Sequence, residues 1–365
     1  MKTLDIINFL ETIAPAALQE GYDNSGLIYG SPEAECAGVL VCLDVTDQVI
    51  DEAISLHCNL VISHHPLVFR ALKKINPDKG ISRVLVKAIK NDVSIYAIHT
   101  NLDNVLSGVN NRIAEILGLI NRNILDKKAG QIKKLICYVP VSHLEGVRTA
   151  LFTAGAGHIG KYRECSFAAE GKGTFKAGEG ADPYVGQIDN RHTENEIRLE
   201  VVFSAWQQNA VLHAMKAAHP YEEIAYDVLS PDNFHDEVGS GLVGDLEQPM
   251  EALSFFALVR ERFQVPVIRF SPLTGKLIKR VAICGGAGSF LISNAIGSGA
   301  DLFLTADLKY HDFFEADGRI VLADMGHYES EQFTQDLLID LLKQKFPNFA
   351  VLKTGVATNP VNYFL

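Results

Sequence analysis

The sequence predicts an α/β core into which a smaller α+β unit is inserted, and two patterns support this. Near the start of the chain and again toward its end, short apolar runs alternate with amphipathic helical stretches, as in proteins built around a partly parallel sheet. From about residue 131 the order changes to strand, helix, glycine-rich loop, strand, helix and strand, which favours a ferredoxin-like unit. We therefore expect residues 1–130 and 236–365 to form the core and residues 131–235 to form the insert.

The composition is that of a globular protein without a membrane segment. The chain has 365 residues, of which 47% are hydrophobic and 21% charged, as is ordinary for an α/β protein. No apolar run reaches the roughly 18–20 residues that cross a bilayer, and the N-terminus lacks a secretory pattern, so we expect a cytoplasmic protein with no membrane partner. The six cysteines form no C-x-x-C pair, which favours reduced, buried thiols. A net charge of −11 argues against a general affinity for nucleic acid.

The first part of the core is predicted to begin with alternating helices and strands. In order, these are a helix over residues 4–13 ended by Pro15, strands over 27–29 and 38–43, and a helix over 47–56. Thr46 is placed to cap that last helix. Before the first strand, Asp23 and Asn24 lie in a polar turn, where they either form local hydrogen bonds or take part in a site.

The next predicted strand ends in two adjacent histidines. An apolar run from Leu60 is followed by His64 and His65, and Pro66 prevents the strand from continuing. Neighbouring side chains at a strand end diverge, so these imidazoles could reach two different metal ions. The alternative is a pair of hydrogen-bonded loop histidines.

A further strand, over residues 93–98, also ends in groups that bind metals or move protons. His99 and Asp103 follow it. Both could be metal ligands, or His99 could lie outside the ligand shell and orient a ligand.

The third such strand end lies near the C-terminus. The apolar run Ile320–Ala323 is broken at Gly326 and followed by His327 and Glu331. Four residues apart on a helix, these two side chains leave the same face, either as metal ligands or as a solvated pair.

Taken together, the three strand ends favour a metal site with two ions. Open α/β sheets place their sites at the carboxyl ends of strands. Mixed imidazole and carboxylate donors suit zinc, iron(II) or manganese, and a carboxylate can bridge two ions. Five or six such ligands are too many for one tetrahedral ion, so we infer a dinuclear site.

The insert carries one polar cluster of its own. Its predicted elements are strands over residues 133–140, 196–203 and 224–229, helices over 144–153 and 207–218, and a glycine-rich passage between residues 155 and 180 that we expect to be a loop. The segment His219–Glu223 is either a turn that ends a helix or a regulatory or interface site.

After the insert, two more strand ends carry candidate groups. A strand over residues 280–284 runs into Gly285–Ser289, where backbone N–H groups could approach an anion, or where the chain simply turns tightly. A strand over residues 301–305 leads to Asp307, Lys309 and His311, which suit substrate binding or proton transfer but could also begin a capped helix.

These motifs, taken as a set, resemble the Nif-three-like family, whose members are often labelled GTP cyclohydrolase 1 type 2 homologs or dinuclear metal-centre hexameric proteins. The similar segments are Asp23-Asn24 before Gly26, Leu43-Asp44-Val45-Thr46, His64-His65-Pro66, His99-Thr100-Asn101-Leu102-Asp103, Gly285-Gly286-Ala287-Gly288, Lys309-Tyr310-His311-Asp312 and Gly326-His327-Tyr328-Glu329-Ser330-Glu331. The likeness covers nearly the whole chain. The insert resembles the CutA-like or PII-like domain of the longer bacterial members.

The resemblance implies a toroidal homohexamer, a trimer of dimers, with two divalent transition-metal ions in each subunit. The implied metal ligands are His64, His65, Asp103, His327 and Glu331, with Glu331 as the bridge. Zinc is the first choice of metal, with iron or manganese as alternatives. Two positions depart from the family pattern: Tyr22 stands where Trp is common, and Ala306 where Gly is frequent.

The function we expect is that of a metal-dependent hydrolase acting on a nucleotide or a phosphoester. The family label suggests a purine nucleotide such as GTP. The two metals would activate a water, and His99 or His311 would carry protons. The residues expected on the substrate side are Asp23, Asn24, Gly286, Ser289, Asp307 and Lys309. The alternative is a non-catalytic metal-binding hexamer whose insert is a regulatory or partner-binding module.

Overall fold

The computed structural model describes residues 1–364 and divides into two compact units. One combines Met1–Asp126 with the chain from Glu237 onward, and the other is Lys127–Asp236. The second unit is thus inserted into the first. The sequence predicts this insert at residues 131–235.

The first unit contains two sheets, of which one is formed by the N-terminal part of the chain and one late strand. Its strands are β1 (Gly26–Tyr29), β2 (Val39–Cys42), β3 (Leu60–Ser63), β4 (Ser94–Ala97) and β15 (Val351–Lys353), in the order β1-β4-β3-β2-β15. All pairs are parallel except β1 with β4. Every residue of β2, β3 and β4 is buried, as expected for parallel strands covered on both faces.

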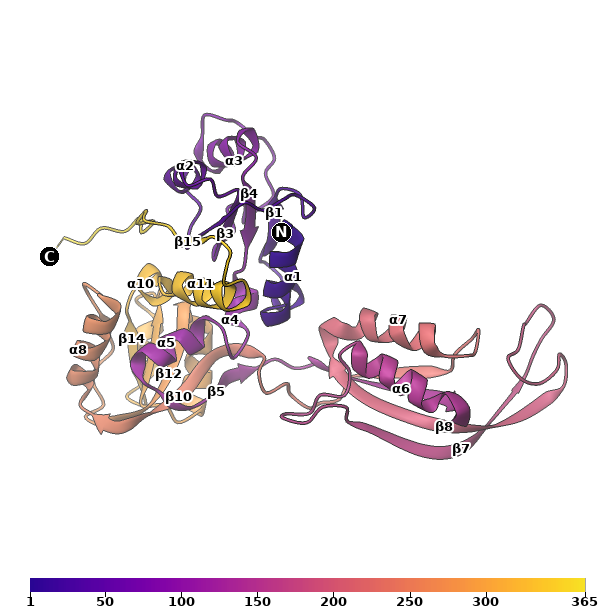
Figure 1. The fold of residues 1–365 in the computed structure, drawn as a ribbon. Coiled ribbons are helices and arrows are strands. Elements are labelled where there is room, and N and C mark those ends of the chain that lie inside the picture. The colour runs from indigo at the N-terminus through magenta and orange to yellow at the C-terminus, as the bar shows by residue number, and fades with distance from the viewer. Residues whose placement is uncertain (365) are drawn as a thin grey trace. The chain divides into compact units, whose positions relative to one another are not determined.

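Helices of the same segment cover this sheet (Figure 1). They are α1 (Thr3–Ile13), α2 (Asp47–Ser55), α3 (Gly80–Lys90), α4 (Thr100–Asp103) and the short 3₁₀ helix Ala16–Leu18. Thr46 caps α2 by accepting a hydrogen bond from the Val49 N–H, as the sequence predicts. Apolar residues of α2 and α3 pack on the strands in one core.

The second sheet holds the C-terminal half of the unit. Its strands are β5 (Ile120–Lys127), β10 (Gly239–Met250), β11 (Arg269–Phe270), β12 (Ile278–Ala287), β13 (Leu302–Ala306) and β14 (Val321–Asp324), in the order β11-β14-β13-β12-β10-β5. The accompanying helices are α5 (Val109–Leu117), α8 (Ala252–Phe263), α9 (Ile292–Gly297), α10 (His327–Glu331), α11 (Thr334–Lys345) and the 3₁₀ helices Ser289–Leu291 and Asp312–Ala316. Strands β12, β13 and β14 are parallel.

Strand β12 corrects one expectation about the glycine-rich segment. The sequence predicts a strand that ends at Cys284 and a loop from Gly285 to Ser289, whereas the strand continues to Ala287. The register with β13 shifts between Ile283 and Ala287, so the glycines form an irregular strand end rather than a free loop.

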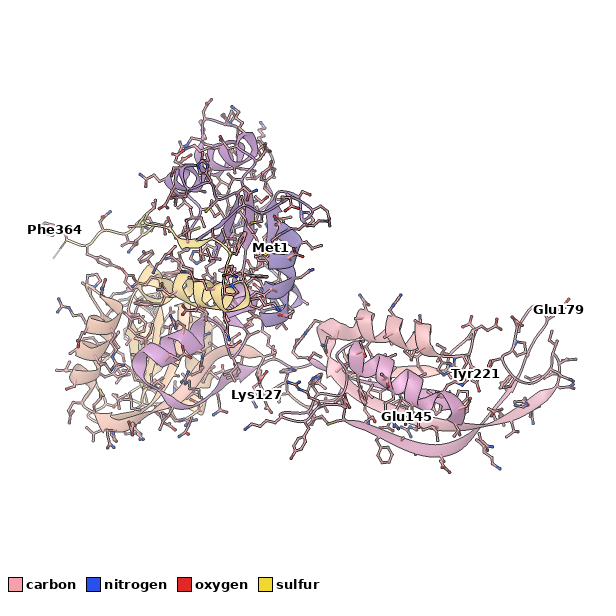
Figure 2. All side chains as sticks on the ribbon, viewed as in Figure 1. Met1, Lys127, Glu145, Glu179, Tyr221 and Phe364 are labelled. Carbon is pink, nitrogen blue, oxygen red and sulfur yellow. The ribbon has the colours of Figure 1, made fainter. Side chains whose placement is uncertain are left out.

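The insert is a four-stranded antiparallel sheet with two helices packed on one face. Its elements are β6 (Ile132–Pro140), α6 (Leu144–Thr153), β7 (Ser166–Lys176), β8 (Arg191–Ser204), α7 (Gln208–Ala218), β9 (Tyr226–Leu229) and the 3₁₀ helices Val141–His143 and Ala205–Gln207. The strand order β7-β8-β6-β9 is that of a ferredoxin-like fold, which confirms the predicted class. Figure 2 labels Glu145 at the start of α6 and Tyr221 after α7.

The glycine-rich passage of the insert is not all loop, because it contains β7. That strand pairs with β8 over its whole length, from Ser166 with Val201 to Lys176 with Arg191. Gly171 and Gly173 weaken the local strand preference, and pairing with a long neighbour overrides it.

Two further expectations concern the described residues, 1–364. None of their helices is both long enough and apolar enough to cross a membrane. The six cysteines are all free and five are buried, as their scattered positions predict.

Candidate metal centre

Four histidines from three strand ends meet in the first unit. His64 and His65 follow β3, His99 follows β4, and His327 begins α10 just after β14. The ring centroids of His65 lie 5.0 Å from His64, 5.2 Å from His99 and 5.3 Å from His327. The carboxyl ends of strands from two different sheets therefore contribute to one cluster, which residue spacing alone could not establish.

Glu331 lies between two sets of donor atoms and presents one oxygen to each. Its Oε2 is 3.0 Å from His65 Nε2 and 3.1 Å from His327 Nε2. Its Oε1 is 3.8 Å from His64 Nε2, which is in turn 3.7 Å from Asp103 Oδ1. This is the arrangement expected of a carboxylate that bridges two ions.

Two buried atoms in this cluster have no hydrogen-bond partner among the described residues. They are His64 Nε2 and Asp103 Oδ1. Buried polar atoms are almost always paired, so an unpaired nitrogen facing an unpaired carboxylate oxygen calls for a further group. Two donors each about 2.1 Å from one ion lie about 3.0–3.4 Å apart, close to the separations seen here. The residues present therefore fit divalent metal ions.

Each histidine is oriented through its other ring nitrogen, Nδ1. The Nδ1 of His65 is 2.8 Å from Asp44 Oδ1, and that of His99 is 2.8 Å from Asp23 Oδ1. The Nδ1 of His327 is 2.7 Å from Asp307 Oδ2, and the Nδ1 of His64 is 2.9 Å from the Ile98 carbonyl oxygen. We assign the proton to Nδ1 on the basis of these acceptors, which leaves each Nε2 lone pair available to a metal.

Burial and the neighbouring charges shift the proton affinities of the cluster. Burial alone would lower the pKa of His65, but hydrogen bonds to its two carboxylate partners raise it to about 10. The pKa of His327 is raised to about 11 in the same way. Burial works to raise the pKa of Glu331, yet the facing imidazoles keep it well below its usual value. Protons can thus balance the charge of Glu331, and a metal ion would have to displace them.

Asp103 differs from the other carboxylates. Its burial, and then the nearby charge of Glu331, raise its pKa to about 7. A cation between His64 and Asp103 would remove this penalty by favouring the ionised form of the carboxylate. The donor set of His64 and Asp103 is therefore the one that depends most on a metal ion for charge balance.

The glycine-rich end of β12 leaves space for the carboxylate of Glu331. A Cβ at Gly286 would lie 2.3 Å from Glu331 Oε1, and the residue has a φ of +62°, which favours glycine. The N–H of Gly286 donates to Ser330 Oγ, and that of Gly285 donates to Asn110 Oδ1. These amides are already paired, so the segment supports the cluster instead of forming an open anion cradle.

The other residues predicted for the site fall into two groups: those held near the cluster by hydrogen bonds, and those that are exposed and lie outside it. Asp23 and Asp307 are the hydrogen-bond acceptors of His99 and His327, and the Asn24 amide donates to the Val68 carbonyl. The structure does not bring the second group into the cluster: Ser289, Lys309 and His311 are exposed, and His311 contacts the rings of Tyr310 and Phe314.

Sequence reasoning missed Asp44 as a site residue. It follows β2, whose carboxyl end lies beside that of β3. The signal was available, because an Asp directly after a buried parallel strand lies at the same sheet edge as the histidines. Its partner Thr358, which donates to Asp44 Oδ2 at 2.9 Å, is 314 residues away and could not have been identified from the sequence.

A cavity of about 450 Å³ opens beside the cluster. Its lining includes His65, His327, Arg269, Tyr328 and, from the C-terminal segment, residues 359–361 and Tyr363. Arg269 is its one basic side chain apart from the imidazoles, and it is paired with Asp324. A small ligand in this cavity would lie against two of the candidate ligand side chains.

Comparison with known proteins gives full-length matches. The profile of the family described as Duf34/NIF3 (NGG1p interacting factor 3) matches residues 1–360. A protein from Halalkalibacterium halodurans named GTP cyclohydrolase 1 type 2 homolog is 37% identical over 364 residues, covering 98% of each chain. Its namesake in Bacillus subtilis is 37% identical over 363 residues, covering 98% of this chain and 97% of the other.

A solved structure agrees with this assignment. The structure of a Bacillus cereus protein related to NIF3 superposes with a TM-score of 0.85 at 37% sequence identity, covering 100% of this chain and 99% of the other. The matches extend across both units. The chain therefore belongs to the Duf34/NIF3 family.

Proposed function

We propose that the protein is a metal-dependent hydrolase that acts on phosphoester or nucleotide substrates with two divalent transition-metal ions bound. The observation that carries this proposal is Glu331, whose two carboxylate oxygens face two separate sets of donors. His64 and Asp103 would hold one ion, and His65 and His327 the other. Such a pair of ions polarises a phosphoryl oxygen and lowers the pKa of a water.

Imidazole and carboxylate donors together suit zinc best, with iron or manganese as alternatives. The protein's part is to fix these donors before substrate arrives. The hydrogen bonds from Asp44 to His65 and from Asp307 to His327 do this for one ion.

His99 is the residue we assign to proton transfer. Its Nδ1 is fixed by Asp23, and its ring lies 5.2 Å from those of both His64 and His65. It could also bind metal, because its ligand atom lies within 4.8 Å of those of His64 and His65. The exposed His311 has no such placement, so we assign it no catalytic role.

The cavity beside the cluster has a volume that suits a small substrate, whose anionic group would lie against the metal ions. The lining carries Asp44, Asp307, Asp324 and Glu329, and Arg269 is paired with Asp324, so the two metal ions would have to supply the positive charge. The names of the relatives suggest GTP as the first nucleotide to test.

A paired substitution tests the roles of His99 and Glu331. The protein would be reconstituted with zinc, manganese or iron and assayed with GTP, other nucleotides and p-nitrophenyl phosphate. We expect His99→Ala to lower turnover roughly 10²–10⁴-fold while metal content is retained. Glu331→Ala should lose metal and activity together.

Two outcomes would contradict these roles. If His99→Ala loses metal as completely as Glu331→Ala, His99 is a ligand and not a proton shuttle. If the wild-type protein hydrolyses nothing with any metal, a non-catalytic metal-binding hexamer becomes the better proposal.

The metal content itself is a separate prediction. Purified wild-type protein should carry about two metal equivalents per chain, because the donors divide into two sets. The double variant His64→Ala, His327→Ala removes one imidazole from each set and should lose most of this metal by elemental analysis. His311→Ala, which removes an exposed histidine, is the matched control and should keep it. Full retention in the double variant would refute the ligand assignment.

A further inference from the structure

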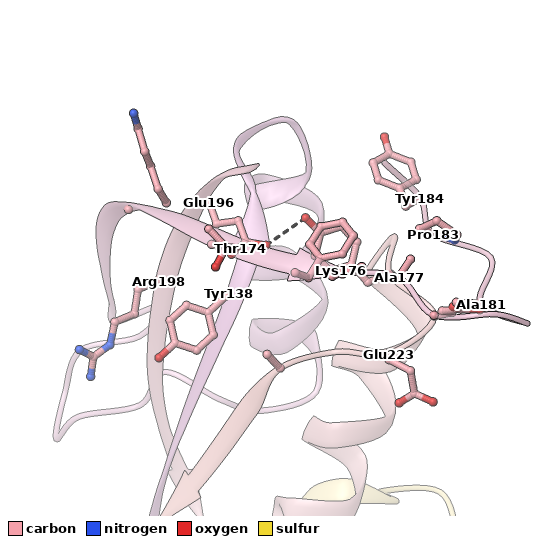
Figure 3. A pocket seen from close by; sticks show the side chains of 18 of the residues that line it. Tyr138, Thr174, Lys176, Ala177, Ala181, Pro183, Tyr184, Glu196, Arg198 and Glu223 are labelled. Atoms are coloured by element: carbon pink, nitrogen blue, oxygen red, sulfur yellow. Dashed lines mark hydrogen bonds between the residues drawn. The ribbon is translucent and has the colours of Figure 1, made fainter. Parts of the chain in front are cut away.

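The insert contains a larger cavity, of about 830 Å³, that has no part in the metal centre (Figure 3). It lies on the sheet face opposite the two helices and is lined by β6, β7, β8 and the segments 177–184 and 221–225. Its volume is within the range of small-molecule sites. The segment His219–Glu223, which the sequence singles out as polar, supplies part of its wall.

The floor of this cavity is shaped by glycines of β7. Gly171 and Gly173 pair with Glu196 and Glu194 of β8. A Cβ at Gly173 would lie 1.9 Å from Glu196 Oε2, so a larger residue there would have to displace this carboxylate from its place above the strand. Glycine inside a strand weakens it and often marks a place where a ligand approaches the backbone closely.

The Glu196 carboxylate is held in position by a chain of hydrogen bonds. The Tyr221 hydroxyl donates to Glu196 Oε1 at 3.0 Å, the dashed bond of Figure 3. Tyr221 is itself fixed, because its N–H donates to His219 Nδ1 and His219 Nε2 donates to the Tyr138 carbonyl. His219 is buried, and its burial lowers its pKa, so the neutral ring that this pattern requires is favoured.

Aromatic rings line the same cavity as this carboxylate. The ring of Tyr221 lies 6.4 Å from that of Phe175 and 6.1 Å from that of Tyr184. Tyr138 lines the same cavity and is labelled with Tyr184 and Glu196 in Figure 3. Aromatic faces around a carboxylate attract organic cations, through the ring quadrupoles and the charge together.

The basic residues in the lining do not neutralise Glu196. Lys176 is paired with Asp189, and Arg198 with Glu200. Lys172 also belongs to the lining, but it lies between Gly171 and Gly173, and strand alternation places its side chain on the other face of β7 from these glycines. The charge presented to a ligand at the floor is therefore negative.

We propose that this cavity binds a small organic cation, with an ammonium group seated against Glu196 and the rings of Tyr138, Phe175, Tyr184 and Tyr221. The charge of the floor selects the cation, and the rings select an alkylated or otherwise weakly hydrated one. The insert is thus a binding module for a ligand unrelated to the metal centre.

Choline and its uncharged carbon analogue 3,3-dimethylbutan-1-ol test this proposal on the full-length protein. The two probes have the same shape and differ in charge. Calorimetry and ligand-observed NMR should show saturable binding of choline. The affinity for the uncharged analogue should be lower by about 10-fold or more. Equal affinity for the two probes, or no saturable choline binding at millimolar concentrations, would overturn the proposal.

Substitutions locate the site. Glu196→Gln should weaken choline binding about 10-fold or more, because it removes the charge and keeps the shape. Tyr184→Leu should weaken it less. Glu194→Gln is the matched control: Glu194 is two residues away on the same strand, is paired with His192 at 2.9 Å and does not line the cavity. It should bind choline as the wild type does.

The same variants show whether the cavity binds a small molecule or is filled by contacts with a second copy of the chain. Circular dichroism melting should be alike for the Gln variants, which shows that loss of binding is not loss of folding. If Glu196→Gln and Glu194→Gln bind choline equally, Glu196 is not the cation's partner. If Glu196→Gln instead changes the sedimentation of the protein with no effect of choline on either form, the cavity is filled by contacts between chains and the proposal is wrong.

Discussion

At the scale of single residues, the candidate metal centre depends on the hydrogen-bond acceptor that orients each imidazole. Residue types at the strand ends could be predicted from the sequence, since His64, His65, His99 and His327 each follow an apolar run. Their acceptors could only partly be predicted. A hydrogen bond such as that between His65 and Asp44 joins different strands, and no local spacing encodes it.

Gly286 is the residue for which the prediction from the sequence and the role in the structure differ most. The sequence shows only that a glycine-rich segment follows a strand, which fits an anion cradle or a tight turn equally well. The deciding fact is the position of Glu331 Oε1, 2.3 Å from where a Cβ would be. That contact joins β12 to α10 and exists only in the folded chain.

Substituting Gly286 tests this role. Gly286→Ala should lower metal content, because the methyl group must displace the carboxylate of Glu331. It should also reduce the free energy of unfolding by about 1–2 kcal/mol or more, since φ is +62°. Gly275→Ala is the control, because Gly275 has a φ of +74° and open space around a Cβ. In a denaturant titration, Gly275→Ala should show a similar loss of unfolding free energy from its positive φ, but it should keep its metal. Equal metal content in the two variants would refute the steric argument.

At the scale of elements, every strand that is buried on both faces was predicted, and so were some that are only partly buried, such as β1 and β9. Continuous apolar runs mark β2, β3, β4, β13 and β14, and every residue in them is buried. The strands that were missed, β5, β7, β10, β11 and β15, are edge strands or carry many polar residues and glycines. Their formation depends on pairing with a neighbour, which a single sequence does not display.

The C-terminal segment after β15 has no regular secondary structure, and it reaches the candidate metal centre. Thr358 donates to Asp44 Oδ2, while Asp44 Oδ1 accepts from His65. Asn359 and Tyr363 both donate to Glu329 Oε1, and Glu329 is buried beside Gly326. The segment therefore braces the carboxylates next to two of the proposed ligands.

Thr358 allows this bracing to be measured. Thr358→Val removes the hydroxyl and keeps the shape, so it should weaken metal binding about 10-fold, the lower end for groups that support a ligand. Thr358→Ser restores the donor and should bind metal as the wild type does. Competition with a chelator gives both affinities. Indistinguishable affinities for the Val and Ser variants would show that the segment merely lies over the site.

At the scale of the whole molecule, the order of elements predicted an insert of the right class. The ferredoxin-like fold followed from the strand and helix sequence even though β7 was expected as loop, because the remaining elements leave few other arrangements. The first and last residues of the insert could be predicted less well from the sequence. The chain crosses from the core to the insert within β5, whose polar residues give no sequence signal of a boundary.

The two units should separate cleanly in a deletion. Lys127 and Asp236, the first and last residues of the insert, form an ion pair, so the ends to be rejoined are close together. Every residue proposed to hold metal lies in Met1–Asp126 or beyond Glu237. A chain lacking residues 127–236, with Asp126 joined to Glu237 by a short Gly/Ser linker, should fold and keep about two metal equivalents. Elemental analysis and thermal melting measure both properties, and the same deletion carrying Glu331→Ala is the metal-free control. If the deletion protein is insoluble or metal-free with several linker lengths, the core depends on the insert and the two units are not independent.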